Sequence, residues 1–303
     1  MEDARVMSEA AEILDHLTLE KVSRLRLVAR TVVESFIQGQ HRSVYKGFSV
    51  EFAQHREYAR GDEMRHIDWK VFGRSDRLFV KQYEEETNLR AMICLDASGS
   101  MAFTSNGESK FAYAQRAAAA LAYLMIAQSD SVGLTVFDTE IRSSMPPRST
   151  KGHLTTLLKV LAETQPDKET NLGKVLHTLT AQIKRRGLVI VISDFFARID
   201  DLVPALAHLR HKRHEVILVQ VLDPQEETFP FQQMYEFRSM ENPEQRIKLD
   251  APRVRALYLE RFERHRRQLQ EACHQFHFDY VTLTTDKPLD AALSHYLRHR
   301  QEQ

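Results

Sequence analysis

The sequence contains little cysteine and no apolar run long enough to cross a membrane. Only two cysteines, Cys94 and Cys273, occur in 303 residues. Cys94 lies within an apolar run, which indicates a buried core position, argues against a disulfide framework and favours a reducing compartment. The first residues are acidic and lack the short apolar stretch of a signal peptide. We therefore expect a cytoplasmic protein.

The chain also lacks an excess of charge of either sign. Its 42 basic and 42 acidic residues leave no net charge at pH 7, so no overall field attracts nucleic acid or an anionic membrane. The most basic segment, 253–267, has glutamates among its arginines and no clear row of aromatic side chains to stack on bases. The longest apolar stretch, 117–127, is too short to span a bilayer. We expect neither a nucleic-acid partner nor a membrane span.

From residue 90 onward, short apolar segments alternate with helical ones. The apolar segments are rich in Val, Ile and Leu and do not alternate with polar residues, so both of their faces are buried. Such strands are typical of a mainly parallel sheet covered by helices, and the predicted fold class is α/β, doubly wound. The expected strands are 91–95, 132–137, 188–192, 216–222 and 278–283, and the expected helices are 111–127, 154–162, 172–184 and 254–276.

The first 88 residues have a different character. Residues 19–37 place apolar side chains at three- and four-residue spacings, which predicts a helix. Two strands are expected at 47–52 and 78–83, and the segment between them is dense in charged and aromatic residues. We predict an N-terminal module of helices and small strands over 1–88, followed by the α/β domain over 89–303.

Three polar clusters lie where the α/β domain is expected to bind a ligand. Asp96-Ala97-Ser98-Gly99-Ser100 directly follows the first strand, Asp194 follows the strand 188–192, and Thr170 precedes a helix. Ligands of open α/β sheets bind beyond the carboxyl ends of the strands. The sequence therefore predicts that these three loops meet there.

The residue types of the three clusters suit a hard cation. The hydroxyls of Ser98, Ser100 and Thr170 can act as neutral oxygen ligands, and Asp96 and Asp194 can bind directly or through water. This mixture favours Mg²⁺, with Mn²⁺ or Ca²⁺ as other candidates. Because few carboxylates bind it directly, the cation stays electrophilic and can accept an acidic side chain from a protein partner.

These clusters resemble a known metal site. The segment Asp96 to Met101 resembles the first motif of the metal-ion-dependent adhesion site of von Willebrand factor A domains. Thr170 and Asp194 match the threonine of its second motif and the aspartate of its third. The resemblance covers roughly residue 89 to the C-terminus and implies an intact site that binds proteins and does not catalyse a reaction.

The preceding segment resembles the bacterial proteins grouped as domain of unknown function fifty-eight. In that family a short N-terminal module precedes the A domain. Many members are linked with MoxR-type AAA+ ATPases, so the resemblance implies an adaptor or chaperone partner of such an ATPase. The residues that carry the resemblance are Gly47, Glu51, Phe52, Arg56, Tyr58, Gly61, Asp62, Arg65, Ile67, Asp68, Trp69, Glu85 and Glu86.

Two other functions remain open on sequence alone. A magnesium-dependent phosphohydrolase would use Asp96 as its nucleophile, but it would normally need a second carboxylate near Asp96 and a lysine for the phosphate. Ser98 stands where that carboxylate would help, and no Gly-rich phosphate loop or G-K-S/T motif occurs. A purely structural interaction protein would keep the fold and leave the site empty.

The single tryptophan of the chain, Trp69, lies among charged residues. Arg56 and Arg65 can stack on its ring or pair with Asp68. One hypothesis is a partner-docking surface formed by these four residues. The other is a structural cluster that fixes the small module onto the α/β domain.

Overall fold

The computed structural model describes residues 20–34, 52–57, 71, 73, 77–83, 89–105, 107–242 and 244–292. The chain divides into two compact units. Unit 1 contains residues 1–39 and 89–303, and unit 2 contains residues 40–88.

Unit 1 is built on a six-stranded sheet with the order β10-β7-β6-β3-β4-β5. Five of its strands run parallel, and only the edge strand β5 is antiparallel to its neighbour. The order reverses direction beside β3, as in doubly wound folds, so the predicted fold class is confirmed. The strands are β3 (Arg90–Asp96), β4 (Ser131–Phe137), β5 (Ile141–Arg148), β6 (Leu188–Ser193), β7 (Glu215–Leu222) and β10 (Asp279–Thr284).

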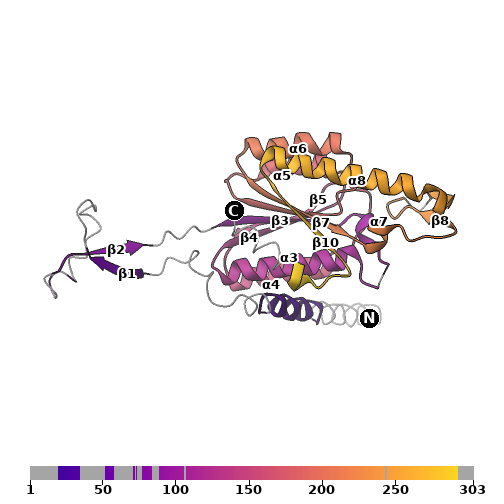
Figure 1. The fold of residues 1–303 in the computed structure, drawn as a ribbon. Coiled ribbons are helices and arrows are strands. Elements are labelled where there is room, and N and C mark those ends of the chain that lie inside the picture. Colours follow the sequence, from indigo (N-terminus) through magenta and orange to yellow (C-terminus); the bar gives the residue numbers. More distant parts are fainter. Residues whose placement is uncertain are drawn as a thin grey trace, which may run out of the picture. The chain divides into compact units, whose positions relative to one another are not determined.

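Helices cover both faces of this sheet (Figure 1). One face carries α3 (Lys110–Ala127) and α4 (Lys151–Glu163), and the helix over 20–34 lies beyond them. The opposite face carries α5 (Leu172–Gln182), α6 (Ile199–His211) and α8 (Ala251–Phe276).

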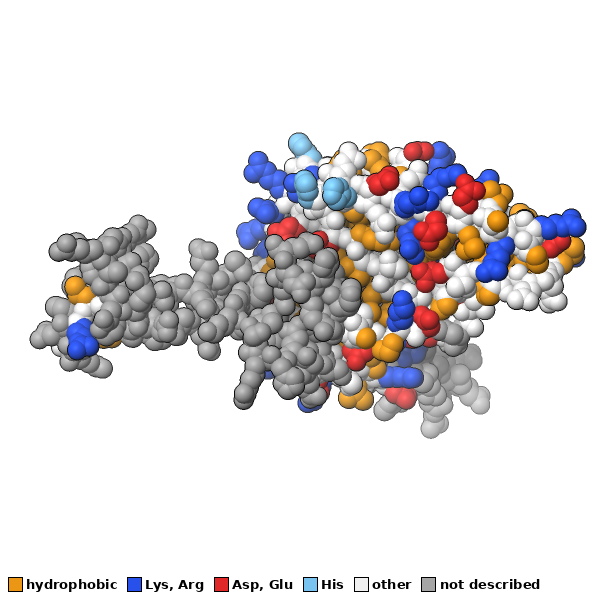
Figure 2. Space-filling model, viewed as in Figure 1, with side chains coloured by type: hydrophobic (Ala, Val, Ile, Leu, Met, Phe, Trp, Pro, Cys, Tyr) orange, Lys and Arg blue, Asp and Glu red, His pale blue; other side chains and the backbone are white. Residues whose placement is uncertain are grey.

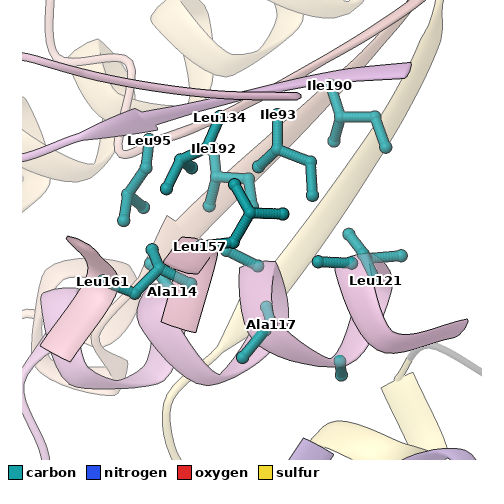
Figure 3. Close-up of a cluster of buried hydrophobic side chains, with 14 of the residues drawn as sticks. Ile93, Leu95, Ala114, Ala117, Leu121, Leu134, Leu157, Leu161, Ile190 and Ile192 are labelled. Carbon is teal, nitrogen blue, oxygen red and sulfur yellow. The ribbon is translucent and has the colours of Figure 1, made fainter. Parts of the chain in front are cut away.

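The apolar residues of each central strand divide between the two helical layers. In β3, Ile93 and Leu95 belong to the cluster shared with α3 and α4, whereas Met92 and Cys94 belong to the cluster shared with α5, α6 and α8. Figure 3 shows the first cluster, with isoleucines and leucines of the strands facing alanines of α3. Successive side chains of a strand point to opposite faces, so a strand covered on both sides is apolar throughout.

The helix over 20–34 belongs to unit 1, although the sequence predicted it as part of the N-terminal module. Val22, Leu25 and Ala29 are buried in the same core cluster as α3. Their three- and four-residue spacing forms one apolar stripe, and a stripe of this kind needs a partner surface. The core cluster that contains residues of α3 and α4 provides that surface. Only residues 40–88 form a separate unit.

Unit 2 contains an antiparallel pair of strands, β1 (Phe52–Glu57) and β2 (Phe79–Tyr83). Of the expected strand 47–52, only residue 52 lies within the described residues, and it is the first residue of β1. Of the four residues of the docking hypothesis, Arg56 lies in β1 opposite Val80. The other three, Arg65, Asp68 and Trp69, lie outside the described residues, and the docking surface remains a prediction.

Between β7 and α8 the chain forms a short helix and a hairpin. The helix is α7 (Pro224–Thr228), and the hairpin pairs β8 (Met234–Arg238) with β9 (Arg246–Asp250). Together they lie at the end of the unit where α7 and β8 are labelled in Figure 1.

The surface of unit 1 has mixed charge. On the face drawn in Figure 2, acidic and basic side chains are interspersed over much of the described surface. This distribution agrees with the balanced composition of the chain. Among the described residues, no helix is both long enough and apolar enough to cross a bilayer.

A buried aspartate directly before β4 leads to a first prediction. Asp130 is 3% exposed, and its Oδ1 accepts a hydrogen bond from the N–H of Leu89 at 3.1 Å. Burial raises the pKa of Asp130 to about 6, although the Leu89 N–H opposes the shift. The unfolded chain therefore loses this proton at lower pH than the folded chain, and the folded state loses stability as pH rises from about 4 through about 6.

Asp130→Asn removes the charge and keeps an oxygen that can accept the same hydrogen bond. We expect the free energy of unfolding of the variant to exceed that of wild type by on the order of 1 kcal/mol at pH 8. Near pH 4 the two free energies should be equal. Urea denaturation at both pH values measures the difference. An equal advantage at the two pH values contradicts the prediction.

Candidate metal site

Asp96 organises the loop that follows β3. The side chain is fully buried at the carboxyl end of the strand. Its Oδ1 accepts a hydrogen bond from the N–H of Ser98 at 2.9 Å, and its Oδ2 accepts one from the hydroxyl of Ser193 at 2.6 Å. The loop then forms a short 3-10 helix, and the hydroxyl oxygens of Ser98 and Ser100 lie 3.2 Å apart.

The segment before α5 is joined to this loop by backbone hydrogen bonds. The N–H of Gly99 donates to the carbonyl of Lys168 at 2.7 Å, and the N–H of Asp167 donates to the carbonyl of Ala97 at 2.9 Å. This pairing holds Thr170, two residues further on, near the loop. Its Oγ1 is buried and has no hydrogen-bond partner among the described residues.

Arg142 on β5 holds the same segment in place. Its guanidinium donates to the carbonyls of Gln165 and Asp167, both at 2.7 Å, and its Nε pairs with the carboxylate of Asp138. Burial raises the pKa of Asp138, but hydrogen bonds from the Glu140 N–H and Arg142 outweigh it and hold the pKa below its usual value. The carboxylate is therefore ionised and fixes the arginine.

Asp194, directly after β6, is part of a buried ion cluster. Its Oδ2 accepts a hydrogen bond from the ammonium of Lys110 at 2.8 Å, and its Oδ1 accepts one from the N–H of Phe196 at 3.1 Å. Lys110 also donates to Glu226 at 2.6 Å. The side chains of Lys110 and Asp194 are 0% and 1% exposed. Burial lowers the pKa of Lys110, but the two carboxylates outweigh burial and hold it above its usual value.

The position of Lys110 explains why it needs two carboxylates. It is the first residue of α3, where the helix dipole disfavours a cation. Glu226 comes from α7, and its second carboxylate oxygen accepts the N–H of Asp223 at 2.9 Å as part of a capping box. One ammonium therefore joins α3, the end of β6 and α7.

Two carboxylates of the site repel each other. Burial and the neighbouring charge of Asp194 raise the pKa of Asp96 to about 7, although hydrogen bonds from Ser193 and Ser98 lower it. Ionised Asp96 and Asp194 are thus costly together, and a bound cation relieves this cost.

The residues that the structure brings together fit a hard divalent cation. A buried hydroxyl without a partner, as at Thr170, costs free energy unless its oxygen is bound. Hydroxyl and carboxylate oxygens are ligands that Mg²⁺ accepts. Among the described residues, no group of three or more His, Cys, Asp or Glu side chains is placed to hold a metal, so this ligand set depends on its hydroxyls.

Sequence reasoning did not find the supporting residues of the site. Lys110 and Ser193 are 84 and 97 residues from Asp194 and Asp96, the motif residues that they contact, and no spacing pattern connects them. Arg142 acts on the segment before Thr170 and contacts no motif residue in the described structure. Lys110 also bears on the phosphohydrolase hypothesis, which lacked a lysine. Two carboxylates already bind its ammonium, so it is not free for a phosphate.

Comparison with known proteins agrees with this architecture. Residues 54–268 match the family described as protein of unknown function DUF58. An uncharacterized protein of Mycobacterium bovis is 28% identical over 210 residues, which make up 68% of this chain and 65% of that protein. The match therefore spans less than two thirds of the relative.

Two solved structures match this chain over part of its length at low identity. An aerotolerance-related membrane protein from Bacteroides fragilis, with multiple mutations to serines, is 18% identical with a TM-score of 0.50, over 71% of this chain and 100% of that one. The VWA domain of SpRpn10 is 11% identical with a TM-score of 0.39, over 68% of this chain and 94% of that one. Because the family match extends over residues 54–268, more than half of the sequence, the chain belongs to the DUF58 family of proteins of unknown function.

Proposed function

We propose that unit 1 is a metal-ion-dependent protein-binding domain. Asp96, Ser98, Ser100, Thr170 and Asp194 hold one divalent cation, Mg²⁺ or in its place Mn²⁺ or Ca²⁺. The bound cation supplies an electrophilic position that an acidic side chain of a partner completes. The unpartnered hydroxyl of Thr170, held beside the loop of Ser98 and Ser100, carries this proposal.

Binding agrees better than catalysis with the contacts of Lys110. Each oxygen of Asp96 accepts one hydrogen bond, from the loop or from β6, and keeps a lone pair for a cation or its bound water. The ammonium that would neutralise a phosphate is bound by two carboxylates. We therefore propose that the domain is not an enzyme.

Thr170→Val tests the metal site directly. Valine has the shape of threonine and removes only the hydroxyl, which has no partner in the described structure. In EDTA we expect the variant to be at least as stable as wild type, because an unsatisfied buried group disappears. With millimolar Mg²⁺, wild type should gain about 2.7 kcal/mol at a hundredfold excess over Kd, and the variant should gain much less.

Thr285→Val is the matched control. The hydroxyl of Thr285 is also buried without a partner, but it is outside the proposed ligand set. This variant should respond to Mg²⁺ as wild type does. Thermal unfolding with Mg²⁺ and with EDTA measures all three proteins. The proposal is overturned if Mg²⁺, Mn²⁺ and Ca²⁺ all leave the unfolding temperature of wild type unchanged. It is also overturned if Mg²⁺ stabilises the Thr170→Val variant as much as wild type.

The MoxR-type AAA+ ATPase that the family resemblance implies is the first partner to test. Binding of the purified ATPase should require both the cation and Asp96, because the cation bridges the two proteins. An interaction that survives EDTA and Asp96→Ala assigns binding to another surface, such as unit 2.

A further inference from the structure

The turn of the β8–β9 hairpin reaches the metal site. Its shape is set by Ser239, whose hydroxyl accepts the N–H groups of Glu241 at 3.3 Å and Asn242 at 3.0 Å. The N–H of Ser239 donates to the carbonyl of Gln245 at 3.0 Å and closes the turn. The turn is thus a defined structure that presents Glu241.

Gly99 allows this turn to approach. A Cβ at Gly99 would lie 2.5 Å from the carbonyl oxygen of Met240 and 3.2 Å from that of Lys168. The first distance is far too short for a real contact, so any side chain at this position must move the turn. The residue between Ser98 and Ser100 therefore contacts the turn directly.

The carboxylate of Glu241 lies at the proposed ligands. It interacts with the side chain of Ser100 and with the backbone N–H of Thr170. Burial, Asp194 and Glu169 raise the pKa of Glu241, and these two hydrogen-bonding groups lower it. No lysine, arginine or histidine in the described part of the chain forms an ion pair with it. An acidic group placed among other acidic groups, without a basic partner, must either take up a proton or bind a cation.

We propose that Glu241 is an internal ligand of the cation, occupying the coordination position that the acidic side chain of a partner would take, while Asp96 and Asp194 act through bound water. This inference rests on the proposed function. The β8–β9 turn then competes with the partner, and binding requires the turn to leave Gly99. The chain restricts its own site through one carboxylate from a segment more than a hundred residues from the motif in sequence.

Mn²⁺ is the probe for the test, because water bound to Mn²⁺ increases the relaxation rate of solvent protons. In Glu241→Gln the charged ligand is lost, and we expect Mn²⁺ affinity to fall on the order of tenfold. Each bound Mn²⁺ should gain a water molecule and show a higher relaxation rate than in wild type. Acetate, the simplest external carboxylate, should then reduce that rate in the variant and leave wild type unchanged.

Two further variants make the test specific. Gly99→Ala keeps every proposed ligand and displaces the turn, so it should reproduce the higher relaxation rate and the response to acetate. Glu244→Gln changes an exposed glutamate of the same turn and should behave as wild type.

The two proposals fail in different ways. If wild type binds no Mn²⁺, or if the Thr170→Val variant binds Mn²⁺ as tightly as wild type does, the proposed metal site is absent. If wild type binds Mn²⁺ through Thr170 but Glu241→Gln changes neither affinity nor relaxation rate, the metal site stands and Glu241 is not its ligand.

Discussion

Lys110→Met is expected to lower the free energy of unfolding by about 3–5 kcal/mol, the usual cost of breaking a buried ion pair by removing one partner. Methionine fills similar space but leaves Asp194 and Glu226 buried without a cation. Asp194 is 1% exposed and Glu226 14%, so water compensates neither carboxylate fully. Urea denaturation in EDTA measures the loss.

Lys151→Met is the control for this change. Lys151 is also the first residue of its helix, α4, but its side chain is exposed. We expect this variant to stay within about 0.5 kcal/mol of wild type, as surface substitutions usually do. If Lys110→Met also stays within that range, the ion cluster does not stabilise the fold. Added Mg²⁺ should restore part of the loss in Lys110→Met, because the proposed cation compensates Asp194.

Asp96→Asn is expected to change metal binding and stability in opposite directions. The variant loses one of the two carboxylates of the proposed site, and we expect Mg²⁺ affinity to fall by roughly a hundredfold. Without metal it should be more stable than wild type by on the order of 1 kcal/mol at neutral pH, because burial and Asp194 both disfavour the ionised form. The new amide N–H can be accepted by the hydroxyl of Ser193, which in wild type donates to Oδ2. Calorimetric titration with Mg²⁺ and urea denaturation in EDTA measure the two effects.

Asp223→Asn is a matched control for Asp96→Asn. Asp223 is a fully buried aspartate directly after β7, and its carboxylate accepts hydrogen bonds from the N–H groups of Ser105 and Gln225. This variant should lose stability, because one of its two oxygens becomes a donor, and should still bind Mg²⁺. If the Asp96→Asn variant binds Mg²⁺ with the affinity of wild type, Asp96 is not a ligand of the cation.

The central strands and helices were predictable because buried elements consist mainly of apolar residues, which can be recognised in the sequence. Continuous apolar runs predicted β3, β6 and β7, and the structure confirms these strands. Five elements were missed, namely β5, α6, α7, β8 and β9. α6 has a regular apolar stripe of Leu202, Ala205, Leu206 and Leu209, but Pro204 lies inside it, and a proline in a helix interior argues against a helix. β5 alternates between half-buried and exposed residues and includes two prolines, which argue against a strand.

The site was predictable only in its local parts. The motif residues Asp96, Ser98 and Ser100 follow one strand, and the structure holds them together with Asp194 and the Thr170 segment. Lys110 and Glu241 were not found, because tertiary packing alone brings them there. Whether a cation binds remains a prediction.

The double proline of β5 limits how copies of this chain can associate. β5 lies at the edge of the six-stranded sheet and pairs on one side with β4. The N–H groups of successive strand residues point to alternate sides, so with Pro146 beside Pro147 one missing donor faces outward whichever way the strand is turned. A second molecule cannot add a fully hydrogen-bonded strand there. Growth of the sheet from molecule to molecule, the first step of many aggregates, is therefore blocked at this edge.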